Sequence, residues 1–164
     1  MANLGCICGR RMSSTNLPSD NIIYVFPKKG VRETLELNPD ISLLDYERDY
    51  NRELEYWYCT ECRRVHVVDN VPCGKVLTVY ESDRGSETYS PSELPLASEP
   101  DFFYVFSEKE LYDEEECDNP ANLAEWIERQ GIMHYYCISS DKNTVYKREL
   151  GGKYRKVYSK EKSR

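Results

Sequence analysis

Short runs of β-branched and aromatic residues, separated by polar turn-forming residues, dominate the pattern of hydrophobic and polar positions along the chain. Runs of this length and composition are typical of β-strands. Gly, Pro, Asn and Asp in the segments between them indicate turns. The pattern predicts strands at 21–26, 55–58, 65–68, 75–80, 102–106, 133–138, 144–148 and 154–158.

Two segments carry the start signals of helices. Asn38 followed by Pro39 indicates a helix start, because Asn is a good N-cap and Pro suits the first helical position. We expect this helix to continue to about residue 50, and we expect the segment 27–30 to end the strand before it. A second helix is expected from Asn119 or Pro120 to about Gln130, where Gly131 follows as a C-terminal stop.

The two halves of the chain resemble each other at an offset of about 80 residues. Tyr24-Val25-Phe26 corresponds to Tyr104-Val105-Phe106, and Trp57-Tyr58-Cys59 corresponds to Tyr135-Tyr136-Cys137 at a slightly smaller offset. Chance similarity between two segments rich in strand-forming residues is the alternative explanation. We interpret the match as an internal duplication in which each copy has the order strand, helix, strand, strand.

The sequence therefore predicts an α+β fold with a mainly antiparallel sheet and pseudo-symmetry between the two copies. We expect residues 1–82 to form the first repeat, 83–100 a linker and 101–164 the second repeat. Ser, Glu and Pro are frequent in the linker, as in irregular segments generally. Copies of this size are marginally stable alone, so one packed body is the preferred arrangement and two small domains are the alternative.

The cysteine count and the hydrophobic pattern indicate the compartment. Seven cysteines cannot all close disulfides within one chain. The first residues lack the apolar core of a secretion signal, and no stretch approaches the roughly 18 apolar residues of a spanning helix. We therefore expect a cytoplasmic protein without a membrane segment.

Four cysteines form two close pairs, Cys6 with Cys8 and Cys59 with Cys62. Two thiolates on one tight turn can reach the same ion, and zinc takes four such ligands in structural sites. Gly9, directly after Cys8, gives its turn the backbone freedom that it needs. The spacing resembles the two cysteine knuckles of zinc-ribbon proteins, within 6–9 and 58–63 only. We expect one structural Zn²⁺ per chain, bound to the first repeat.

A redox dithiol and unliganded thiols are the other interpretations of these pairs. His66 follows Cys62 by four residues and could replace one cysteine as ligand, but alternation along its strand favours a solvent-facing side chain. In the second copy Cys137 corresponds to Cys59 and Ser140 to Cys62, so this copy cannot form a knuckle. The cysteines outside the two pairs are Cys73, Cys117 and Cys137.

The sequence contains no recognisable catalytic motif. Only His66 and His134 could supply an imidazole for acid–base chemistry, and no glycine-rich phosphate loop is present. Four thiolates would complete the coordination of zinc and leave no open position for a substrate or water. We expect a protein that is not an enzyme.

Charge is distributed unevenly along the chain. Residues 141–164 hold nine Lys or Arg against three Asp or Glu, so this tail carries +6 and residues 1–140 carry −13 within a total of −7. An acidic body favours basic partners, although solubility alone also explains it. Bacterial immunity and inhibitor proteins are similar to this chain in size and acidity, which implies a basic protein partner such as a toxin or nuclease. The expected partner-binding residues are Tyr112, Asp113, Glu114, Glu115, Glu116 and Asp118.

Nucleic-acid binding is the alternative function. Four arginines lie beside the paired cysteines, and the basic tail could add contacts to phosphates. The acidic charge of the whole chain opposes such binding, so nucleic acid is the less favoured partner. The arginines are Arg10, Arg11, Arg63 and Arg64.

Overall fold

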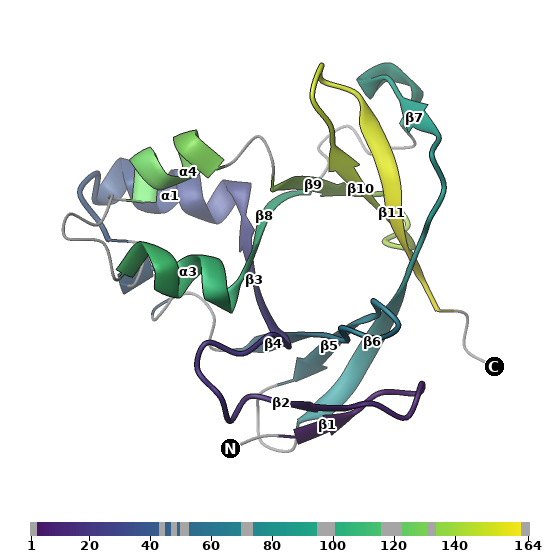
Figure 1. Ribbon diagram of the computed structural model, residues 1–164. Coiled ribbons are helices and arrows are strands. Elements are labelled where there is room, and N and C mark those ends of the chain that lie inside the picture. The colour runs from purple at the N-terminus through teal and green to yellow at the C-terminus, as the bar shows by residue number, and fades with distance from the viewer. Residues whose placement is uncertain are drawn as a thin grey trace.

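The computed structural model describes residues 3–42, 45–46, 49, 53–69, 74–94, 101–115, 123–130 and 134–161. Eight strands form a closed antiparallel barrel, in the order β10, β9, β8, β3, β4, β5, β6 and β11, with β10 and β11 paired to close it (Figure 1). These strands are β3 (Ile22–Pro27), β4 (Leu54–Tyr58), β5 (Val65–Asp69), β6 (Lys75–Ser82), β8 (Phe102–Ser107), β9 (Tyr135–Ile138), β10 (Thr144–Arg148) and β11 (Tyr154–Lys160).

The barrel consists of two four-stranded meanders, β3 to β6 and β8 to β11. The meanders join at two antiparallel seams, β3 with β8 and β6 with β11. The first seam is symmetric about the pair Val25 and Val105, where Tyr24 lies opposite Phe106 and Phe26 opposite Tyr104. The two halves therefore share their order of strands, whereas an origin by duplication stays a prediction.

The expectation of an α+β fold is wrong. Helices account for 19 % of the chain, and the strands form a closed barrel instead of a sheet with helices on one face. The seams explain the difference, because each half pairs through both of its outer strands and leaves no free edge. Strand patterns within one half could not reveal this closure.

The helices whose bounds lie within the described residues are outside the barrel, next to β3 and β8 (Figure 1). They are α1 (Lys28–Leu37), α3 (Glu108–Glu115) and α4 (Leu123–Gln130). The prediction that the strand ends at 27–30 is confirmed, since β3 ends at Pro27. The helix α1, which begins at Lys28, was not predicted, and Asn38 ends it by donating its N–H to the Thr34 carbonyl. Of the helix expected from Asn38, only residues 45, 46 and 49 are both described and helical. Within its described residues, α4 agrees with the second predicted helix.

The helices cover an apolar cluster on the outer face of the first seam. Phe26 and Phe106 are almost fully buried there, with ring centroids 6.2 Å apart. Tyr46 packs edge-on against Phe26, and Leu123 from α4 completes the cluster. Side chains alternate along a strand. Phe26 faces outward, so Val25 and every second residue of β3 counted from it face the barrel interior.

Three short strands were not predicted. β1 (Asn3–Gly5) and β2 (Arg11–Ser13) form a hairpin that packs outside β4 to β6, and β7 (Thr88–Tyr89) pairs with β11 (Figure 1). β7 and the 3-10 helix η1 (Pro91–Glu93) lie in the expected linker. The predicted boundaries at 82 and 100 stay a prediction. The described helices include none that is long and apolar enough to cross a membrane.

Candidate metal centre and barrel cavity

The β1–β2 hairpin carries Cys6 and Cys8 to the tip between β4 and β5, which carries Cys59 and Cys62. The four Sγ atoms all lie within 4.8 Å of one another. Cys6 Sγ is 3.4 Å from Cys62 Sγ, and Cys8 Sγ is 3.6 Å from Cys59 Sγ. Thiols that converge in this way can bind one metal ion, as the cysteine spacing predicted.

Each cysteine pair lies on a turn closed by two backbone hydrogen bonds. In the first turn, the N–H groups of Cys6 and Gly9 donate to the carbonyls of Arg10 and Cys6, at 2.8 and 2.9 Å. Gly9 has φ +89°, a conformation that glycine adopts without strain. Two segments that lie about fifty residues apart in sequence thus present preformed turns to each other.

The second turn, Cys59–Arg64, is closed in the same way. The Cys59 N–H donates to the Arg64 carbonyl at 2.9 Å, and the Arg63 N–H donates to the Cys59 carbonyl at 2.8 Å. Arg63 has φ +61°, which is uncommon for a residue with a Cβ. This conformation fixes the direction in which the Arg63 side chain leaves the turn.

Backbone N–H groups point at the sulfur atoms. Cys59 Sγ accepts hydrogen bonds from the N–H groups of Cys62 and Glu61, and Cys6 Sγ accepts one from Cys8. Burial raises the pKa of the Cys6 thiol to about 12. Burial also raises the pKa of the Cys62 thiol, but hydrogen bonds from the Arg64 N–H and side chain outweigh it and lower the value to about 6. The donors around Cys62 favour its thiolate, the form that binds a metal, whereas burial holds the pKa of the Cys59 thiol, like that of Cys6, above the usual value.

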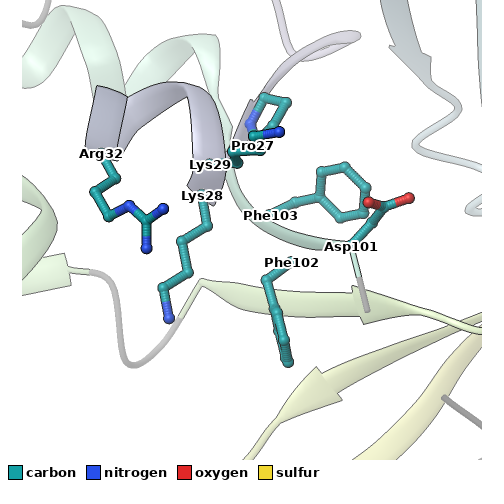
Figure 2. Close-up of a pocket in the computed structure, with 7 residues that line it drawn as sticks. All are labelled: Pro27, Lys28, Lys29, Arg32, Asp101, Phe102 and Phe103. Atoms are coloured by element: carbon teal, nitrogen blue, oxygen red, sulfur yellow. The ribbon is translucent and has the colours of Figure 1, made fainter. Parts of the chain in front are cut away.

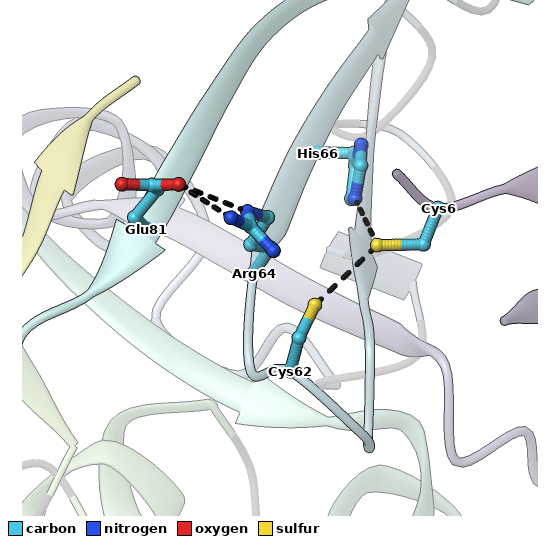
Figure 3. A network of polar contacts seen from close by, with 5 residues as sticks. All are labelled: Cys6, Cys62, Arg64, His66 and Glu81. Atoms are coloured by element: carbon cyan, nitrogen blue, oxygen red, sulfur yellow. Dashed lines mark hydrogen bonds and ion pairs between the residues drawn. The ribbon is translucent and has the colours of Figure 1, made fainter. Parts of the chain in front are cut away.

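Two polar residues lie beside the thiols, Arg64 next to Cys62 and His66 next to Cys6 (Figure 3). The Arg64 guanidinium binds Glu81 Oε1 with its Nη2 at 2.5 Å and its Nε at 3.2 Å, so this arginine is held in an ion pair. His66 is 3 % exposed, and its Nε2 lies 3.3 Å from Cys6 Sγ. Burial, and next the Arg64 charge, lower the pKa of His66 and favour the neutral ring.

The expectation that His66 faces solvent is wrong. The β1–β2 hairpin covers the outer face of β5, so an outward-facing residue on this strand is buried. In this position His66 contacts the thiol cluster, and Trp57, its partner on β4, packs in the same apolar cluster as Cys6 and Met12. Strand alternation gave the correct face, and the missing information was the unpredicted hairpin.

The other cysteines do not join the cluster within the described part of the chain. Cys137 is fully buried on the outer face of the second half, beside Leu94, Tyr146 and Tyr154. Burial raises the pKa of its thiol to about 12. Cys73 and Cys117 lie outside the described residues.

A cavity of about 440 Å³ lies where residues of β4, β6, β9, β10 and β11 meet. Lys147 lies opposite Tyr136 on one side and Arg155 on the other, so the three share one face of the sheet. Their neighbours Cys137 and Tyr146 pack on the outer face, which places these three side chains on the inner face. The lining residues are Tyr58, Arg63, Ser82, Asp83, Arg84, Tyr136, Lys147, Arg155, Val157 and Tyr158.

A second hollow, of about 570 Å³, lies at the start of α1 (Figure 2). Lys28, Lys29 and Arg32 of α1 line it together with Phe102 and Phe103 of β8. Lys28 Nζ already donates to the Tyr135 hydroxyl at 3.1 Å and lies 5.6 Å from the centre of the Phe102 ring. This lysine ties α1 to the barrel wall, and the interior cavity is the stronger candidate for ligand binding.

The structure describes little of the predicted acidic partner surface. Tyr112, Asp113, Glu114 and Glu115 belong to the end of α3, where only the backbone is described, and Glu116 and Asp118 lie outside the described residues. The basic protein partner therefore stays a prediction. Of the arginines proposed for nucleic acid, Arg64 is held by Glu81, Arg10 and Arg11 are exposed on the hairpin, and Arg63 lines the cavity.

A family model matches residues 2–93, more than half of the chain, under the description "Domain of unknown function (DUF8617)". The chain belongs to this family. The matched segment includes all four clustered cysteines and ends with η1. Comparison with curated proteins and with solved structures gives no match. The resemblance to immunity and inhibitor proteins accordingly stays a prediction.

Proposed function

We propose that the protein is a non-enzymatic binding protein, in which one structural Zn²⁺ holds the first half of the barrel and the basic cavity binds anions. The observation that carries the proposal is the position of Arg63. This residue follows the metal-ligand candidate Cys62 directly and lines the cavity. The turn that would bind zinc therefore also presents a cation to the ligand.

Zinc is the metal that this donor set favours. Four thiolates from two tight turns match the tetrahedral structural sites of zinc, and soft thiolates disfavour Mg²⁺ and Ca²⁺. His66 Nε2 lies 3.3 Å from Cys6 Sγ, and in the tautomer with a proton on Nε2 the ring would donate to the thiolate, as groups behind metal ligands do. Four sulfur ligands leave zinc no position for a substrate, which supports a structural role.

The imidazoles lie away from the cavity. His66 contacts Cys6, and His134 Nε2 lies 3.3 Å from Glu110 with its ring against Phe106 on the helix side of the barrel. Of the described residues that line the cavity, none is a histidine or a cysteine. Binding without turnover is the activity that this lining supports.

The charge balance of the cavity favours an anion. Four cations line it against one carboxylate, Asp83, and that carboxylate is 3.0 Å from Lys156 Nζ. Arg155 is paired with Glu149 at 2.8 Å. The ion pairs between described residues include none with Arg63, Arg84 or Lys147. Cations gathered at a partly enclosed surface attract anions more strongly than they would in open water.

Elemental analysis of the purified protein tests the metal. We expect about one zinc per chain, and cobalt substituted for zinc should show the absorption of tetrahedral thiolate coordination. Zinc content near zero in protein that is folded and reduced would contradict the structural metal.

Thermal shifts with pyrophosphate, citrate and sulfate test the anion site. We expect at least one of them to raise the melting temperature of the parent protein, and the Lys147→Met, Arg155→Met double variant to lose that shift while keeping its zinc. If none of the anions stabilises the zinc-loaded protein at low ionic strength, the binding function is wrong.

A further inference from the structure

The side chains that line the barrel cavity combine positive charge with aromatic surface. The aromatic part consists of Tyr58, Tyr136 and Tyr158, which come from β4, β9 and β11. Lys147 Nζ lies 5.7 Å from the centre of the Tyr136 ring. A ligand in this cavity would meet guanidinium and ammonium groups together with ring surfaces.

The tyrosines lie next to the cations. Burial raises the pKa of Tyr158 to about 12, and the nearby positive charge of Arg63 opposes this shift. Burial likewise raises the pKa of Tyr136, against the charge of Arg155. Both phenols are therefore neutral near pH 7, so they offer hydroxyl donors and apolar rings without adding negative charge.

Three of the four cations are arginines, whose planar guanidinium groups bind phosphate oxygens in pairs. They come from three separate places: Arg63 from the Cys59–Arg64 turn, Arg84 from the segment after β6, and Arg155 from β11. Cations on separate elements can surround a compact phosphate from several sides. A single carboxylate would use only part of this set.

The size of the cavity limits the ligand. A volume of about 440 Å³ lies within the usual range of small-molecule sites, about 300–1,000 Å³. This is room for a phosphate and a ring together, and it is too small for a folded protein segment. Tyrosine rings can stack on a planar group of the ligand.

We propose that the cavity binds a small organic phosphate that carries a planar ring, a ligand of mononucleotide size. The proposal rests on the proposed binding function and names the class of anion. The phosphate contacts Arg63, Lys147 and Arg155, and the planar ring contacts Tyr136 and Tyr158. Adenosine monophosphate is the probe, with adenosine and inorganic phosphate as its two parts.

Isothermal titration of the zinc-loaded protein at low salt provides the test. We expect adenosine monophosphate to bind at least roughly tenfold more tightly than either adenosine or inorganic phosphate, because each lacks one set of contacts. Equal affinity for adenosine would overturn the phosphate contacts, and equal affinity for inorganic phosphate would overturn the ring contacts. If citrate binds and adenosine monophosphate does not, the proposed anion binding holds and this inference fails.

One arginine and one lysine, at positions with similar backbone conformation, provide a matched pair of variants. Arg63 and Lys142 both have positive φ, 61° and 57°, at the tips of corresponding hairpins, and only Arg63 lines the cavity. Replacement by glycine relaxes the backbone at either position. We expect Arg63→Gly to weaken adenosine monophosphate binding roughly tenfold with zinc content unchanged, and Lys142→Gly to change it less than about twofold. Equal effects of the two variants would overturn the role of Arg63.

Discussion

The two halves of the barrel close corresponding hairpins in different ways. In the first half, the tip Cys59–Arg64 carries two thiols that meet Cys6 and Cys8. In the second half, the tip 139–144 has the same backbone closure, since the Ser139 N–H donates to the Thr144 carbonyl at 2.8 Å. Its side chains bind one another, with the Ser139 hydroxyl donating to Asp141 Oδ1 at 2.5 Å. One backbone frame thus carries either a thiol cluster that can bind a metal or polar side chains that bind one another.

Strand register shows which residues correspond. Trp57 lies opposite Ile22 on β3, and Cys137 lies opposite Phe102 on β8. Cys137 therefore corresponds to Trp57, and Ser139 corresponds to Cys59. The alignment of the two halves of the sequence matched Cys137 with Cys59, because the residues around them are similar at an offset of 78. The paired strands show that the true offset here is 80.

The outer faces of the two halves are also covered by different segments. The first is covered by the β1–β2 hairpin, which contributes Cys6 and Met12 to a cluster around Trp57. The second is covered by the segment that follows β7, which contributes Leu94 to a cluster around Cys137 and two tyrosines. A short hairpin buries little apolar surface, so a metal is a suitable way to hold it.

The largest expected effect follows removal of one thiol from the cluster. Cys59→Ser should abolish stoichiometric zinc binding and lower the free energy of unfolding by about 4 kcal/mol or more when free zinc exceeds its Kd a thousandfold. Denaturant unfolding with and without zinc measures this loss. Cys137→Ser is the matched control, because it alters a buried cysteine outside the cluster and should keep one zinc per chain. Equal zinc loss in both variants would contradict the assignment of ligands.

Truncation of Leu94 tests the second half. This residue is 8 % exposed in the cluster around Cys137, so Leu94→Ala should cost about 2–5 kcal/mol. Zinc content and the zinc-dependent part of the stability should stay unchanged, because the proposed metal holds the other half. A loss of zinc in this variant would show that the halves are not held independently.

The smallest expected effect concerns Tyr158, which corresponds to Tyr80 of the first half, and appears only in alkaline solution. Burial raises the pKa of both hydroxyls, that of Tyr158 to about 12. A pKa that is higher in the folded state gives stability that is complete below about pH 10, the unfolded value, and is lost as the pH rises toward 12. Tyr158→Phe should reduce the loss of stability between pH 10 and 12, measured by chemical unfolding. An unchanged alkaline profile would contradict the burial of this hydroxyl.

Local patterns in the sequence predicted the barrel strands well. All eight were expected within about two residues of their observed limits, because each is a run of β-branched and aromatic residues bounded by turns. The thiol cluster was also predictable, since Cys6 with Cys8 and Cys59 with Cys62 carry their own spacing signal. These features depend on residues close together in sequence.

Features that depend on distant pairings were not predictable. Closure of the barrel requires β6 to meet β11, and the burial of His66 requires the β1–β2 hairpin to cover β5. The cavity combines Arg63, Lys147 and Arg155 from different strands and turns, so no local motif contains it. Its sequence signals were the basic tail, which supplies two of these three cations, and the arginines beside the paired cysteines, which include Arg63.

Hydrogen exchange before and after zinc chelation tests most directly whether the halves are held by different means. The informative amides are those that close the turns: Cys6, Gly9, Cys59 and Arg63 in the first half, and Ser139 and Lys142 in the second. We predict that chelation speeds exchange of the first group by roughly tenfold or more and leaves the second group nearly unchanged. Equal acceleration at both hairpin tips, or no acceleration at either, would contradict the account.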